Sequence, residues 1–250
     1  MKVSVVVTTK NAEDDLERLL GSLDKFSKEI EVIVVDSLST DNTVDVAKSR
    51  PYVKLISKQC TAGGGRNIGV KNANNDVIAM LDADTEVTDS WLPELVSTMK
   101  YSDIVAGYAP DPAGKHLSRV PIVINGQDIT YPQCNIAYKK QVFDDVGLLR
   151  EDMTYAEDCE FNYRCTKKGY KITYNPKMLA YHYERPTKKQ WISKAVKNGY
   201  GRFELEKFIP EIKNKHEHGF KIQNIIRLGF GFVGYVMGHI RSDKEGPSIR

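Results

Sequence analysis

The sequence predicts an α/β fold in which helices cover both faces of a mostly parallel sheet. Two observations support this prediction. Within the first hundred residues, four continuous apolar runs have the length of a strand: residues 3–9, 32–35, 53–57 and 77–81. Helical patterns separate these runs, and strands that are apolar along their whole length are typical of parallel sheets buried on both faces. Ligands of such sheets bind at the carboxyl ends of the strands, so the candidate chemistry is expected there.

The segments between the strands carry helix signals. Asn11 is predicted to cap the first helix, with Asp14 as its capping-box partner. The apolar face of that helix consists of leucines at helical spacing: Leu16, Leu19, Leu20 and Leu23. Later patterns predict helices over 43–48, 63–73, 156–168 and 188–208, and a strand over 171–174. Residues 107–132 are rich in Pro, Gly and Asp without a period, which is typical of a functional loop or lid.

Length and composition are ordinary for a globular protein, but the charge is unevenly distributed. The chain has 250 residues, of which 41% are hydrophobic and 28% charged. Residues 185–250 hold 14 Lys/Arg against 6 Asp/Glu, whereas residues 1–184 hold 22 against 27. We therefore expect a core over residues 1–185 and a basic helical extension over 186–250. A basic tail indicates either an anionic contact, such as a phosphorylated substrate, lipid head groups or nucleic acid, or simply a solvated helix.

Cysteine usage and the start of the chain favour a reducing compartment. The four cysteines, Cys60, Cys134, Cys159 and Cys165, form no C-x-x-C pair, and no histidine cluster has zinc spacing. The chain enters a strand at once and lacks the layout of a signal peptide. We therefore expect free thiols and a cytoplasmic location.

The strand at 77–81 is followed by two acids. Asp82 and Asp84 are two residues apart, so an extended backbone would point both carboxylates the same way. Two anions so close repel each other, and a bound Mg²⁺ or Mn²⁺ would relieve that repulsion. The alternative is a solvated acidic turn. The position directly after a buried strand favours the metal site.

The second and third strands are also followed by polar or glycine-rich segments. Asp36 and Ser37 have the short polar side chains that can bind a nucleobase and ribose, and Asp41 is predicted to cap the next helix. Residues 62–69 place three glycines before Arg66, which could hold an anion through free backbone N–H groups and the guanidinium. This segment fits neither the Walker A nor the Rossmann pattern, so ordinary loop glycines are the alternative.

Downstream, two acids and a histidine are further candidates. Either Glu157 or Asp158 could act as a general base toward an acceptor hydroxyl, or both could only stabilise the first turn of a helix. His182 follows a predicted strand. A lone histidine is more often structural than a ligand, so its interpretation depends on whether it approaches the metal site.

Taken in order, these segments resemble the family 2 glycosyltransferases of the GT-A fold. The resemblance covers roughly Val3 to His182 and continues weakly to Arg202. It rests on residues 5–11, 36–41, 65–69, 76–85, 134–137, 157–158 and 169–172. The fold it implies is a three-layer α/β/α sandwich around the mostly parallel sheet, with the C-terminal residues as a helical extension.

The resemblance also implies roles for individual residues. Thr8 and Lys10 would lie by the nucleotide, Asp36 and Ser37 by the base, and Arg66 would help to hold the nucleotide. Asp82 would face the ribose or the metal, Asp84 would bind the metal, and His182 would complete its shell. Asp158, paired with Glu157, would be the base, and Arg202 would reach back to the diphosphate. Leu38 departs from the family, since many members have glycine there.

The implied reaction is an inverting transfer of a sugar from a UDP- or GDP-linked donor to a hydroxyl of a saccharide or lipid-linked acceptor. Asp158 would take the proton, while a divalent metal and arginine would stabilise the departing diphosphate. Two alternatives stay open. One alternative is a nucleotidyltransferase that makes sugar nucleotides, a class with the same architecture. In that class the glycine-rich segment directly follows the first strand, whereas in this chain it follows the third. A non-catalytic nucleotide- or carbohydrate-binding module would not need both the acid pair and Asp158.

The last apolar segment, 228–240, suggests a surface contact. It is too short to span a bilayer, which takes about twenty residues. Basic residues flank it, as in an interfacial helix on anionic lipid. Its four glycines instead favour close packing on the body or on a second copy. We therefore expect either docking at the inner face of the cell membrane or a homodimer contact, and no nucleic-acid partner.

Overall fold

The four apolar runs become the parallel half of one sheet in the computed structural model, which describes residues 1–113, 121–153, 155–183, 188–212, 232–233 and 235–237. The parallel strands are β1 (Val3–Thr9), β2 (Ile30–Asp36), β3 (Val53–Ser57) and β4 (Val77–Asp82). They lie in the order β3-β2-β1-β4. The α/β prediction from these runs is confirmed.

The other half of the sheet mixes strand directions, and only the start of β10 was predicted from the sequence. Its strands are β9 (Asn135–Lys139), β6 (Ile104–Tyr108), β10 (Ile172–His182) and β5 (Thr85–Val87), which follow β4 in that order. β9 is antiparallel to both β4 and β6, β10 is parallel to β6, and β5 is antiparallel to β10. The strand predicted over 171–174 is therefore much longer, since β10 continues to His182.

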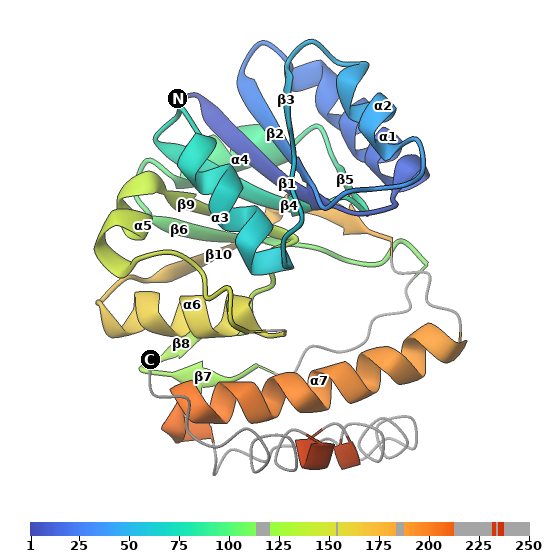
Figure 1. Cartoon of the computed structure of the whole chain (residues 1–250). Helices are drawn as coiled ribbons and strands as arrows, with labels where there is room; N and C mark the ends of the chain where they lie inside the picture. The colour runs from blue at the N-terminus through green and yellow to red at the C-terminus, as the bar shows by residue number, and fades with distance from the viewer. Residues whose placement is uncertain (114–120, 154, 184–187, 213–231, 234, 238–250) are drawn as a thin grey trace.

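Helices cover both faces of this sheet (Figure 1). One face carries α1 (Glu13–Leu23), α2 (Thr43–Lys48) and α4 (Trp91–Thr98), whose apolar residues pack with alternate strand positions such as Val5 and Val7. The intervening Val6 points to the other face, which carries α3 (Ala62–Asn72), α5 (Lys140–Val146) and α6 (Glu157–Lys167). This alternation of burial produces the predicted three layers.

A long C-terminal helix and a small hairpin form a third apolar cluster beside the sandwich. Helix α7 (Lys188–Phe208) runs below α6 in Figure 1 and is followed by the short 3-10 turn η2 (Pro210–Ile212). The hairpin is formed by β7 (Val123–Ile124) and β8 (Gln127–Asp128). The end of α7 packs with it through a cluster of buried side chains: Ile124, Ile129, Met153, Leu205, Ile209 and Ile212. The described part of the 107–132 segment thus contains the end of β6 and this hairpin, with Ile124 and Ile129 buried. The boundary predicted at 185 stays a prediction.

The cap predicted for the first helix is wrong. The N-cap position of α1 is Ala12, and Asn11 has a φ of +49° and accepts a hydrogen bond from the backbone N–H of Thr40. The N–H of Ala12 donates instead to the hydroxyl of Thr43, on the neighbouring α2. The N-cap position of α2 is Asn42, one residue after the predicted Asp41, although Asp41 does accept the backbone N–H of Thr43, the first residue of α2.

Most of the apolar segment 228–240 lies outside the described residues. Of the part that is described, Tyr235 packs edge-on against Phe203 of α7 and donates to Glu206, while Phe232 and Met237 are exposed. None of the helices in the described ranges has the length and apolar content needed to cross a bilayer.

Candidate functional site

The strand register brings the predicted nucleotide residues to one edge of the sheet. Thr8 pairs with Asp82, and the next residue of β1, Thr9, pairs with Asp36. These residues therefore end three adjacent parallel strands, where ligands of α/β sheets bind. Lys10 is exposed directly beyond β1. Thr8, Lys10, Asp36 and Asp82 therefore lie at one edge of the sheet, and the roles implied for them stay predictions.

The turn after β2 is closed by its own polar side chains. The buried carboxylate of Asp36 accepts the backbone N–H of Ser39 at 3.1 Å. The Ser37 hydroxyl donates to the carbonyl of Cys60 at 3.0 Å and accepts its N–H at 3.3 Å. Leu38, between Ser37 and Ser39, has a φ of +56°, in the left-handed region that glycine adopts without strain. The turn thus keeps the backbone that a glycine would favour.

The glycines at the start of α3 serve close packing. The hydroxyl of Thr61, the N-cap, accepts the N–H of Gly64 at 3.1 Å. A Cβ placed on Gly65 would lie 2.8 Å from the methyl carbon of Thr8, and one on Gly69 only 2.2 Å from a methyl carbon of Val6. The absent side chains let α3 lie against β1 and place Arg66 at the strand edge.

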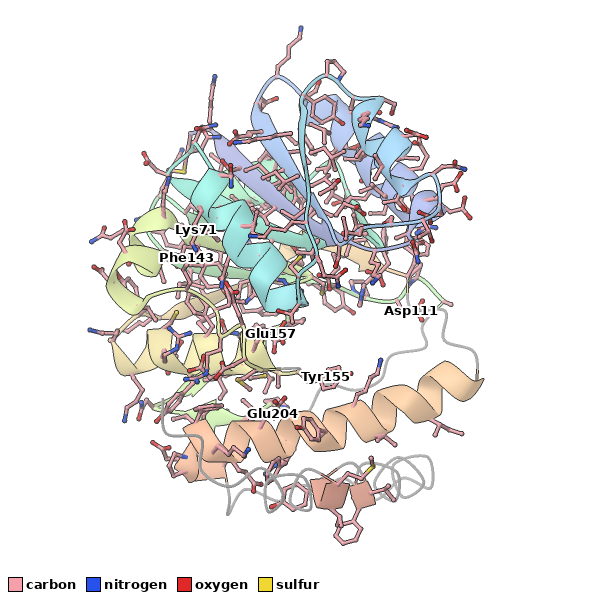
Figure 2. All side chains as sticks on the ribbon, viewed as in Figure 1. Lys71, Asp111, Phe143, Tyr155, Glu157 and Glu204 are labelled. Atoms are coloured by element: carbon pink, nitrogen blue, oxygen red, sulfur yellow. The ribbon has the colours of Figure 1, made fainter. Side chains whose placement is uncertain are left out.

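Arg66 links two carboxylates that are distant in sequence. Its Nη2 donates to Asp82 Oδ1 at 2.9 Å and its Nη1 to Glu157 Oε1 at 2.6 Å. Burial lowers the pKa of Arg66, but the charges of Asp82, Glu157 and Asp158 outweigh it and raise the pKa above its usual value. In Figure 2, Glu157 lies where the first turn of α6 meets α3. The guanidinium therefore joins α3, β4 and α6 at one point.

Asp158 has the properties of a base that works near neutral pH. Burial, reinforced by the charge of Glu157, raises its pKa to about 6, against the opposing effect of Arg66. Its side chain is only partly shielded from solvent, and Oδ1 accepts the backbone N–H of Cys159 at 2.7 Å. A carboxylate with a pKa close to ambient pH is suited to accept a proton from a hydroxyl.

The predicted metal residues lie together, although not by the predicted backbone geometry. Residues 83–84 form a turn after β4, in which the Thr85 hydroxyl donates to the Asp82 carbonyl, so the two acids are not on one extended strand. His182 Nε2 lies 3.1 Å from Asp84 Oδ1. His182 also has a ligand atom within 4.8 Å of a carboxylate oxygen of Asp82. The group is therefore defined by the closeness of His182 to each acid, and not by a contact between the carboxylates of Asp82 and Asp84.

A fourth side chain of this group, Cys134, was not predicted from the sequence. Its Sγ lies within 4.8 Å of ligand atoms of both Asp82 and His182. Burial raises the pKa of its thiol well above the usual range, and the charges of Asp82 and Asp84 act in the same direction. The signal was hidden because Cys134 precedes β9, a strand that the apolar pattern did not reveal.

Arg202 is placed differently from the other predicted donor residues. It lies on α7, where Nε contacts Glu206 at 3.4 Å and Nη2 donates to the Ile212 carbonyl at 3.0 Å. The preceding Gly201 packs closely on Tyr155, and the backbone N–H of Tyr155 donates to Glu204 at 3.2 Å (Figure 2). α7 therefore contacts the chain at Tyr155, two residues before Glu157.

Comparison with known proteins agrees with this geometry. The sequence profile of glycosyl transferase family 2 matches residues 4–147, more than half of the chain. The chain belongs to that family. It is 25% identical over 214 residues to the pre-mycofactocin glycosyltransferase of Mycobacterium tuberculosis, a match that covers 77% of this chain and 45% of the relative. The chain thus spans less than half the length of that curated relative.

Two solved structures share the family 2 fold with this chain. Staphylococcus aureus TarS 1–349 in complex with UDP-GlcNAc aligns at a TM-score of 0.65 and 21% identity, covering 94% of this chain and 81% of that one. The mannosyltransferase PcManGT of Pyrobaculum calidifontis, in complex with GDP-Man and Mn²⁺, aligns at 0.65 and 16%, covering 96% and 70%. At these identities the likeness shows the fold, which is GT-A-like as predicted.

Proposed function

We propose that the chain is an inverting glycosyltransferase that moves a sugar from a UDP- or GDP-linked donor to a hydroxyl of a saccharide or lipid-linked acceptor. The observation that carries this proposal is the bridge from Asp82 through Arg66 to Glu157, beside Asp158. This bridge holds Asp82 and Glu157 at the carboxyl end of the strands, next to Asp158, whose carboxylate is suited to accept a proton. Family membership and the donors named in the TarS and PcManGT structures support the class of donor.

The chemistry follows from what each group can do. Asp158 accepts the proton of the acceptor hydroxyl, whose oxygen attacks the anomeric carbon from the face opposite the diphosphate. Arg66 keeps Asp82 and Glu157 in place and adds positive charge close to the leaving group. Thr8, Lys10, Asp36 and Ser37 would contact the nucleotide. Arg202 would reach the diphosphate by leaving its contacts with the Glu206 carboxylate and the Ile212 carbonyl.

A divalent cation, Mg²⁺ or Mn²⁺, fits the residues at the edge. Asp82, Asp84, Glu157 and Asp158 offer four carboxylates, whose repulsion Arg66 offsets only in part. Carboxylate oxygens suit these ions. Asp82 and His182, whose ligand atoms lie within 4.8 Å of each other, would hold one, with Asp84 as the further ligand through its place beside His182. When bound, the ion would neutralise charge on the donor diphosphate.

The rival activities differ in their products. A nucleotidyltransferase would release pyrophosphate, whereas a glycosyltransferase releases a nucleoside diphosphate, and a binding module releases neither. We would incubate the protein with a panel of nucleotide sugars, with Mn²⁺ or with EDTA, and identify the phosphate product. We expect slow, metal-dependent release of UDP or GDP. Pyrophosphate, or no turnover with any donor and acceptor extract, would contradict the proposal.

A matched pair of variants tests the metal residues. Asp84→Asn should abolish Mn²⁺-dependent donor binding with little change in thermal stability, and His182→Ala should weaken it less. Asp89→Asn is the control, since Asp89 is an exposed acid of the same segment whose contact is to Lys25. Intact Mn²⁺-dependent binding in Asp84→Asn would show that the metal assignment is wrong.

The location and partners of the protein belong to the same proposal. The basic charge of residues 185–250 and the exposed side chains of Phe232, Val233 and Met237 support docking on anionic lipid at the inner face of the cell membrane. A lipid-linked acceptor would fit that location. The alternative is that the same segment contacts a second copy of the chain in a homodimer.

A further inference from the structure

The pairing of β4 with β9 brings the thiol of Cys134 close to the carboxylate of Asp82. β4 and β9 are antiparallel, with Met80 paired to Ile136 and Leu81 to Asn135. Asp82, the last residue of β4, and Cys134, in the turn just before β9, each lie one residue beyond the last of these pairs. Side chains of directly opposed residues lie on the same face of a sheet, about 5 Å apart at Cβ. The closeness of Cys134 to Asp82 is therefore a consequence of strand pairing.

The third member of the group comes from the other end of the sheet. His182 ends β10, where it pairs with Thr85, three residues after Asp82. One ligand atom from each of Asp82, Cys134 and His182 lies within 4.8 Å of the others. Atoms bound to one zinc-sized ion lie about 2.0–2.3 Å from it, hence roughly 3.3–3.8 Å from one another. Small side-chain rotations would bring the three atoms to that spacing.

Cys134 is buried, and both of its neighbours are held by hydrogen bonds. The neighbouring Asn135 accepts a buried hydrogen bond from Trp91 Nε1 and donates to the carbonyls of Met178 and Tyr108, the first of these also buried. Gln133 on the other side donates to Tyr138. Cys165 packs within the apolar cluster on the α3, α5 and α6 face, whereas Cys134 belongs to none of the three apolar clusters of the described residues.

We propose that Asp82, Cys134 and His182 form a site that takes a thiophilic divalent cation of the Zn²⁺ or Cd²⁺ class, with the Cys134 sulfur as a ligand. This inference rests on the metal site of the proposed function and adds to it a soft donor, which magnesium-type ions do not prefer. As the metal–sulfur bond forms, the thiol loses its proton to solvent, so no oxidant or reductant is needed. Asp84 adjoins the site through its contact with His182.

The consequence is a selective order of metal affinities. Zn²⁺ should bind the free protein more tightly than Mn²⁺ or Mg²⁺, and it should displace Mn²⁺. Removing the sulfur should weaken Zn²⁺ and Cd²⁺ strongly but leave Mn²⁺, an ion that prefers oxygen ligands, almost unaffected. This difference separates a sulfur ligand from a cysteine that only fills space.

The test uses metal-free full-length protein without donor or acceptor. Titration with Cd²⁺ should produce the ultraviolet charge-transfer band of a cadmium–thiolate bond, saturating at one ion per chain. The band should disappear in Cys134→Ser and persist in Cys60→Ser, since Cys60 is the more accessible thiol. Competition with a chromophoric chelator should show Zn²⁺ affinity lowered by at least about 30-fold in Cys134→Ser, with less than about threefold change for Mn²⁺.

Several outcomes would overturn the proposal. A band that persists in Cys134→Ser, no saturating band in the wild-type chain, or equal losses of Zn²⁺ and Mn²⁺ affinity would each do so. Cys134→Ala, checked by thermal unfolding, serves if the serine variant does not fold. Mn²⁺-dependent release of nucleoside diphosphate is measured separately, so failure of the sulfur ligand and failure of the proposed activity are distinguishable.

Discussion

The Nη1 atom of Arg66 lies 2.6 Å from Oε1 of Glu157, 91 residues further along the chain. Both side chains are buried, and the other arm of the guanidinium holds Asp82. Breaking such a buried pair on one side leaves an uncompensated charge, which is more costly than the pair is stabilising. This contact is therefore expected to matter for the fold as well as for the site.

We expect Arg66→Met to lower the free energy of unfolding by about 3 kcal/mol in EDTA, because it leaves Asp82 and Glu157 without their cation. Glu157→Gln alone should also destabilise the protein, since it leaves the arginine partly unpaired. The double variant should lose less unfolding free energy than the two single variants lose together, and the difference, their coupling energy, should be about 1–3 kcal/mol. Urea unfolding of the four proteins measures it. Strict additivity would show that the contact carries no energy.

We expect Asp158→Asn to lower kcat by about 10²- to 10⁴-fold with donor binding nearly unchanged, because the proton acceptor is lost. Asp152→Asn is the matched control, since Asp152 is an exposed acid paired with Arg150. Because only ionised Asp158 accepts the proton and its pKa is raised to about 6, kcat/KM should rise with pH below that value and level off above it. A larger rate loss in Glu157→Gln at equal donor affinity would show that Glu157, and not Asp158, is the base.

The parallel half of the sheet could be predicted because its information is local. The strands at Val3–Thr9 and Val53–Ser57 have the bounds that their apolar runs indicate. β9 could not be found in this way, since its place between β4 and β6 depends on pairing with residues thirty or more positions away. Its five residues give no periodic signal of their own.

The site was predictable where a residue follows a recognisable strand and hidden where it depends on register. Asp82 follows an obvious strand, and the proximity of His182 to Asp84 is confirmed at 3.1 Å. The grouping of Cys134 with Asp82 required the antiparallel register of β9. The bridge through Arg66 required knowing that α3 and α6 meet.

We expect Gly69→Ala to destabilise the fold by about 1–3 kcal/mol, because the new Cβ would lie 2.2 Å from a methyl carbon of buried Val6. Gly21→Ala is the control. Gly21 is on the exposed side of α1 with open space around it, so alanine should stabilise that helix by about 1 kcal/mol. Thermal unfolding compares the two. Restored stability in Gly69→Ala with Val6→Ala would identify the contact, and a neutral Gly69→Ala would refute the close packing of α3.

We expect the full chain to co-sediment with vesicles containing anionic lipid, and less so at high salt. Phe232→Asp should reduce partitioning by at least about tenfold, because burying one large apolar side chain contributes roughly 1.5–3 kcal/mol. Phe232 is 67% exposed, and Tyr101→Asp is the control, since Tyr101 is 75% exposed on another part of the surface. Equal partitioning of the two variants would favour the dimer contact, which light scattering of the same proteins would detect.

The turn after β2 offers a test of backbone strain at the departure from the family pattern. Leu38 holds a φ of +56°, where a Cβ costs about 1–2 kcal/mol, and half of its side chain is exposed. Glycine removes that cost but loses more conformational freedom on folding, by about 0.5–1 kcal/mol. Leu38→Gly should therefore be more stable than Leu38→Ala by about 1 kcal/mol, measured by urea unfolding at constant slope. The alanine variant separates the backbone effect from loss of the leucine side chain. If the alanine variant is the more stable, the turn is not strained at Leu38, and the hydrogen bond from Ser39 to Asp36 does not hold it in the left-handed region.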